Sequence, residues 1–170
     1  MKKIIIQGSS RSKGNTFDIT QALKEKLDCD YIDLSTKNIQ LFDYEFKNQE
    51  DDFLPLIKEL LENYDVFIFA SPVYWYTMSA TLKIFFDRFT DCVLKEKELG
   101  RKFEGKHMAA LCCGSSEDEI DSYFIPFRES AKYLKMNYIG DVHTWKDSDE
   151  IDEKVIHKLQ FFSNLIESQN

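Results

Sequence analysis

The chain contains few residues that break regular structure and no long hydrophobic run. Its 170 residues include six glycines and three prolines, against 43% hydrophobic residues. Such a composition is typical of a globular domain and excludes collagen-like and disordered chains. The longest uncharged stretch, residues 66–82, is interrupted by Ser71 and Pro72, so we expect strand, turn and helix there rather than a membrane span. The apolar run at the N-terminus stops at Gln7, too early for a signal peptide.

The sequence is also poor in positive charge and in regularly spaced cysteines. Thirty acidic residues against 22 basic ones give a formal net charge of −8, which argues against a protein that binds nucleic acid or a membrane surface. The cysteines, at positions 29, 92, 112 and 113, show no C-x-x-C or zinc-type spacing, and the three histidines are scattered. We therefore expect no disulfide framework, no metal site and a reducing, cytoplasmic setting.

Short apolar runs alternate with segments of helical periodicity along the whole chain. This alternation predicts one α/β domain over residues 1–170, with a parallel sheet wound on both faces. We expect a flavodoxin-like three-layer sandwich, in which a five-stranded parallel sheet of order 2-1-3-4-5 carries helices on both faces. The predicted strands are residues 4–6, 29–34, 66–70, 108–113 and 138–143, and the helical stripes fall within 15–27, 53–64, 82–89 and 155–166.

Three segments outside these elements lead to further expectations. Ser116-x-x-Glu119 matches a capping box ahead of a fourth helix, which Pro126 is expected to kink or split. Residues 35–51 form a long connection with several apolar side chains, so we expect them to pack over another part of the protein. The Lys- and Glu-rich residues 91–106 are compatible with a cover over the site or over a partner subunit.

The loop after the first strand has the properties of a phosphate site. In the predicted sheet, ligands bind beyond the carboxyl ends of strands one and three, where the strand order reverses. Residues 8–16 combine small and hydroxyl side chains with Arg11 and Lys13, and they lead into a helix whose free N–H groups favour an anion. The spacing matches neither G-x-x-x-x-G-K-[ST] nor G-x-G-x-x-G. The alternative is an ordinary polar turn before a capped helix.

Two further loops are expected at the same edge. Residues 71–79 include three consecutive aromatics, which suit stacking on a flat heteroaromatic ligand or burial in a dimer interface. Residues 113–116 are small and polar, and Cys113 is interpreted as a lining residue rather than a nucleophile. Lys83 and Asp87 are interpreted as an ordinary helix pair.

Two of these loops resemble signatures of the NAD(P)H-dependent FMN reductase family. Residues 8–16 are similar to its G-S-x-R-x-x-G-N-T loop, and residues 71–88 to its S-P-V-Y-W-x-x-x-S-A-x-L-K-x-x-x-D-R block. The resemblance implies a flavodoxin-like fold that binds FMN noncovalently. It implies a phosphate site at Ser9, Arg11, Ser12, Asn15 and Thr16, an isoalloxazine site at Pro72, Val73, Tyr74, Trp75 and Tyr76, and contacts from Gly114 and Ser115 at the far edge of the ring.

The same resemblance implies an activity. NADH or NADPH is the expected co-substrate, and a quinone, flavin, or nitro- or azo-aromatic is the expected acceptor in a ping-pong reaction without a catalytic side chain. A homodimer is also expected. Residues 30–91 contain no cysteine, which excludes the iron–sulfur branch, and the acidic positions of response regulators and the C-x-x-x-x-x-R motif of small phosphatases are absent. A flavodoxin-type electron carrier, which the acidity favours, and an FMN-holding regulatory module remain as alternatives.

Overall fold

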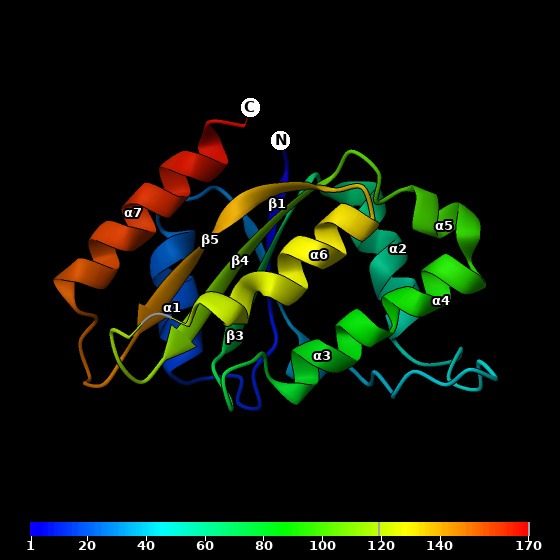
Figure 1. Ribbon diagram of the computed structural model, residues 1–170, viewed down its shortest axis with the longest axis horizontal. Helices are drawn as coiled ribbons and strands as arrows, with labels where there is room; N and C mark the ends of the chain where they lie inside the picture. The colour runs from blue at the N-terminus through cyan, green and yellow to red at the C-terminus, as the bar shows by residue number, and fades with distance from the viewer. Residues whose placement is uncertain (119, 170) are drawn as a thin grey trace.

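The five predicted strands form one parallel sheet in the computed structural model, which describes residues 1–118 and 120–169 (Figure 1). Its order is β2-β1-β3-β4-β5, as the sequence predicts. Every pairing is parallel, so all strands place their carboxyl ends at the same edge. The strands are β1 (Lys3–Gln7), β2 (Asp30–Asp33), β3 (Val66–Pro72), β4 (His107–Gly114) and β5 (Asn137–Trp145).

Helices cover both faces of the sheet and give the predicted three layers (Figure 1). Because side chains alternate along a strand, Ile4 and Ile6 join one hydrophobic cluster and Ile5 the other. One face carries α1 (Asn15–Lys24) and α7 (Glu153–Glu167). The other carries α2 (Phe53–Asn63), α3 (Ala80–Asp87), α4 (Phe89–Leu94) and α6 (Ile125–Tyr133), while α5 (Lys97–Arg101) and the 3₁₀ turns η1 (Leu34–Thr36) and η2 (Asp121–Phe124) are short.

Two helix predictions need correction. The stripe at residues 82–89 belongs to two helices, α3 and α4, which meet at Arg88. Pro126 does not kink a helix but lies in the first turn of α6, where its missing N–H removes no intrahelical bond. Glu119 of the expected capping box lies outside the described residues.

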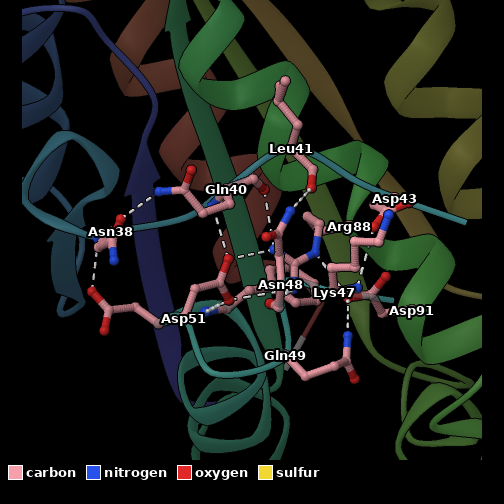
Figure 2. Close-up of polar contacts among 12 residues, drawn as sticks. Asn38, Gln40, Leu41, Asp43, Lys47, Asn48, Gln49, Asp51, Arg88 and Asp91 are labelled. Atoms are coloured by element: carbon pink, nitrogen blue, oxygen red, sulfur yellow. Dashed lines mark hydrogen bonds and ion pairs between the residues drawn. The ribbon is translucent and has the colours of Figure 1, made fainter. Parts of the chain in front are cut away.

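The long connection after η1 packs over a buried arginine. Residues 37–52 contain no helix or strand and wrap around Arg88, whose side chain comes from the junction of α3 and α4 (Figure 2). The expectation that this segment packs over another part of the protein is thereby met. Residues 91–106, by contrast, line no part of the cavity described below. None of the helices in the described residues is long and apolar enough to cross a lipid bilayer.

Candidate functional site

A cavity of about 560 Å³ opens at the carboxyl edge of the sheet, between the loops that follow β1, β3 and β4. This size falls within the usual range of small-molecule sites. Eleven of the twelve residues expected from the sequence line it: Ser9, Arg11, Asn15, Thr16, Pro72, Val73, Tyr74, Trp75, Tyr76, Gly114 and Ser115. Ser12 is not among the lining residues, whereas Asp118, Ile120 and His143 line the cavity without having been expected there.

The buried side chain of Gln7 holds the loop after β1 in place. Gln7 donates from Nε2 to the Ser12 carbonyl at 3.3 Å and accepts at Oε1 from Thr20 Oγ1 at 3.2 Å. Gly8 lies so close to α3 that an added Cβ would be 2.5 Å from Leu82 Cβ. Any larger residue at position 8 would therefore force either the loop or α3 to move, and only glycine allows this close approach.

The N-terminus of α1 presents unpaired donors to the cavity. Gly14 occupies the N-cap position, and no side chain caps the helix. The amides of the first turn therefore have no intrahelical acceptor, which favours an anion at this helix end. The buried hydroxyl residues Ser9 and Thr16 lie beside it, as does the exposed Arg11.

Asn15 and Ser12 make contacts within the protein. Asn15 donates from Nδ2 to the carbonyl of Lys146 at 2.6 Å, which ties the start of α1 to the segment after β5. Ser12 Oγ lies 3.0 Å from Ser35 Oγ, which joins the loop to η1. The Ser12 side chain thus braces the loop instead of lining the cavity.

The aromatic segment after β3 forms a tight two-residue turn. Tyr74 and Thr77 exchange both backbone hydrogen bonds, at 2.9 and 3.1 Å. The two residues between them, Trp75 and Tyr76, adopt left-handed φ angles of 48° and 65°, which bulky side chains rarely do and which stores strain. Their side chains remain 92% and 70% exposed. Tyr74 OH lies 2.9 Å from Ser10 Oγ and so connects this turn to the loop after β1.

His143 supports the third loop of the cavity. Its Nε2 lies 3.0 Å from the Ser116 carbonyl and its Nδ1 lies 3.2 Å from Cys112 Sγ. Since a carbonyl only accepts, Nε2 donates to the Ser116 carbonyl. An added Cβ at Gly114 would lie 3.1 Å from the imidazole, so the loop and the ring fit closely. The sequence does carry a signal for this position: His143 ends a predicted strand at the same edge.

The chemistry of the cavity is that of binding rather than of a protein nucleophile. Burial raises the pKa of the Cys113 thiol to about 11, so it stays protonated at neutral pH. No group of three metal-type ligands occurs among residues 1–118 and 120–169. One end of the cavity offers amides, hydroxyls and Arg11 for a phosphate, and the other offers aromatic and small residues for a flat ring. FMN carries both of these groups, so the donor set fits it.

Comparisons with known proteins show the family of this chain. The model of the NADPH-dependent FMN reductase family matches residues 1–149, and the chain therefore belongs to that family. Over 96 residues, 53% of the chain, it is 34% identical to YwqN of Bacillus subtilis (strain 168), a protein named as an NAD(P)H-dependent FMN-containing oxidoreductase. This match spans about half, 52%, of the relative's length.

Solved structures share the fold at low identity. The Trp repressor binding protein from Bacillus subtilis superposes with a TM-score of 0.76 at 22% identity and covers 97% of both chains. An FMN-dependent NADH-azoreductase from Bacillus anthracis str. Ames Ancestor, in complex with FMN, gives a TM-score of 0.67 at 10% identity and covers 99% of both chains. These likenesses confirm the flavodoxin-like fold.

Proposed function

We propose that this member of the NADPH-dependent FMN reductase family binds FMN in the cavity, oxidises NADH or NADPH there and passes the electrons to a small-molecule acceptor. The observation that carries the proposal is the uncapped N-terminus of α1 in the same cavity as the exposed turn at Trp75 and Tyr76. A phosphate and a flat ring are thereby offered separate partners at the two ends of one cavity. Membership of the family supports the same assignment.

The phosphate end is assigned to the first turn of α1 and the loop before it. Its amides, together with the hydroxyls of Ser9 and Thr16, donate to the phosphate, and Arg11 contributes a positive charge. Asn15 and Ser12 act by fixing the helix start and the loop, through the Lys146 carbonyl and Ser35. This local donor set acts against the net charge of −8, which repels anionic ligands at long range.

The ring end is assigned to the aromatic turn and the loop after β4. Bound FMN supplies the hydride and electron-transfer chemistry. The residues of the chain orient the ring and shield one side of it, and backbone N–H groups in these loops stabilise negative charge near it. No side chain needs to act as an acid or base. The ring end of the cavity is lined by Pro72, Val73, Tyr74, Trp75, Tyr76, Gly114 and Ser115.

The acceptor is proposed to be a quinone, a free flavin, or a nitro- or azo-aromatic, since flat molecules suit an open aromatic site. Nicotinamide and acceptor use the same open space in turn, which gives ping-pong kinetics. The exposed Trp75 and Tyr76 favour a homodimer in which these rings are covered. The proposal also places the protein in the cytoplasm as one domain over residues 1–170.

Absorbance spectroscopy of the purified protein tests the proposal directly. We expect added FMN to remain bound through gel filtration and its visible band to bleach when NADPH is added without oxygen. Continued NADPH oxidation with a quinone should then follow. Bound flavin that only a separate reductase can reduce would identify an electron carrier instead, and flavin that is never reduced would indicate a binding module. Failure to retain FMN would overturn the proposal altogether.

A further inference from the structure

A second cavity adjoins the first along the outer edge of the sheet. It measures about 550 Å³ and lies between α6 and α7 beside the edge strand β5. The two cavities share Ile120 and His143 as lining residues, so they are neighbours around the third loop.

Two cationic side chains line this second cavity, although the chain as a whole is acidic. Arg128 comes from α6, and Lys158 comes from α7. Arg128 donates from Nε and Nη2 to Asp141 Oδ2, at 3.1 and 2.9 Å, and Tyr138 OH donates to the same oxygen at 2.7 Å. This arrangement compensates the Asp141 charge and fixes the guanidinium, whose third nitrogen takes no part in the pair. Such a lining is suited to an anionic group.

An exposed aromatic ring accompanies these charges. Phe161 lines the cavity from α7 and is 72% exposed, whereas Leu159 and Phe162 of the same helix belong to the buried stripe. Edge protection explains a charged pair beside β5, but it does not explain a large exposed ring. The flat face of this exposed ring suits a planar ligand, and the lining around it is largely apolar, with Ile120, Phe124 and Val142 among its residues.

We propose that the cavity between α6 and α7 binds the adenosine-phosphate half of the nicotinamide co-substrate. The inference rests on the proposed function, which places the nicotinamide ring in the first cavity. The other half of a dinucleotide combines a planar purine with phosphates, and the adjoining cavity offers an aromatic ring and cations for these two groups. Arg128 and Lys158 then decide how strongly a 2′-phosphate is preferred, and Phe161 contacts the purine.

Titration calorimetry with adenosine 2′,5′-bisphosphate tests this site without any redox reaction. The probe is added to the FMN-loaded and to the FMN-free protein. Lys158→Gln and Arg128→Gln should each weaken its binding about tenfold, the scale of one charge-assisted hydrogen bond, and Phe161→Ala should weaken it severalfold. The matched control is Arg101→Gln on α5, which removes an exposed cation outside the cavity and should leave binding unchanged.

Steady-state kinetics of the loaded enzyme then separate the two proposals. Lys158→Gln should raise the KM for NADPH with little change in kcat and should hardly affect the KM for NADH, because only NADPH carries the 2′-phosphate. Wild-type binding of the bisphosphate by both charge variants would overturn the adenosine site and leave flavin reduction untouched. Bisphosphate binding that these variants weaken, in a protein that takes up no FMN, would support the cavity and overturn the proposed flavin function alone.

Discussion

The cavity and the surroundings of Arg88 use polar groups in opposite ways. In the Arg88 cluster, which comprises Arg88, Asp51 and Asp91, the guanidinium donates to both carboxylates, and to the carbonyls of Gln40 and Asn48 (Figure 2). All three side chains are buried. In the cavity, no side chain caps the amides that begin α1, and the rings of Trp75 and Tyr76 are exposed. Groups already paired within the protein stabilise the fold, whereas groups left open are available to a ligand.

One sequence block, residues 71–88, contributes to both regions. Residues 71–79 supply the aromatic turn and the cap of α3, since Ser79 accepts from Leu82 N and donates to the Gly8 carbonyl. Arg88, at the end of the same block, lies inside the scaffold and holds residues 37–52 against α3 and α4. A sequence motif therefore marks ligand-facing and structural residues alike, and only burial separates them.

The largest expected effect is the loss of the Arg88 charge. Arg88→Met keeps the length of the side chain but leaves two buried carboxylates without their cation, so the free energy of unfolding should fall by about 3–5 kcal/mol. Urea denaturation measures it. Arg101→Met, which breaks an exposed pair with Glu98, is the control and should stay within about 0.5 kcal/mol of wild type. Equal stability of the two variants would contradict the structural role of Arg88.

The pH dependence of stability sharpens the same contrast. Burial alone would raise the pKa of Asp51, but hydrogen bonds from Arg88 and from the amides of Gln40 and Phe53 hold it below the usual 3.8. The stabilisation is therefore complete above the unfolded-state pKa and is lost as the pH falls through the lower folded-state pKa. In Arg88→Met the hydrogen bond from Arg88 is lost while the two amide bonds remain, so the Asp51 pKa should rise relative to wild type and less stability should be lost on acidification. Urea midpoints between pH 7 and pH 3 should therefore fall less in the variant than in the wild type.

Flavin affinity should change when residues of the cavity are substituted, and not when residues of the Arg88 cluster are. Arg11→Ala removes an exposed cation beside the α1 N-terminus and should weaken FMN binding by about 1–3 kcal/mol, the scale of a lost charge-assisted hydrogen bond. Fluorescence titration measures the affinity, and urea denaturation of the FMN-free protein should show almost no change. Lys13→Ala in the same loop is the control, because Lys13 does not line the cavity. Unchanged affinity in Arg11→Ala would remove Arg11 from the site.

A substitution that relieves the strained turn should raise the stability of the protein and lower its affinity for FMN. Trp75→Gly replaces a bulky residue at a left-handed φ with the one that adopts it freely, at a position where the side chain buries little surface. We expect the free energy of unfolding of the FMN-free protein to rise by about 0.5–1 kcal/mol. FMN affinity should fall, because a ring that stacks on the flavin is lost. A variant that neither gains stability nor loses FMN affinity would show that the turn is an ordinary surface feature.

The sequence predicts the sheet order and the position of the cavity well, because both follow from local apolar runs and from parallel topology. It does not predict Arg88 as a buried residue, since three of its four partners, Gln40, Asn48 and Asp51, lie 37 to 48 positions away along the chain. His143 was missed because its contact with Cys112 depends on the pairing of β4 with β5. Ser12 is a phosphate contact that the family resemblance implies, and the sequence does not tell that its Oγ lies 3.0 Å from Ser35 Oγ.

The smallest expected effect concerns an ion pair on α3, the helix that ends directly before Arg88. Lys83 and Asp87 lie 2.5 Å apart at i and i+4, and both side chains are about half exposed. Solvent screens such a pair, so a double-mutant cycle with Lys83→Ala and Asp87→Ala should give a coupling of about 0.3–0.5 kcal/mol that vanishes in high salt. Within a single motif, burial alone would then separate a weak ion pair from a strong one. A coupling as large as the loss in Arg88→Met would show that exposure does not decide the strength of these pairs.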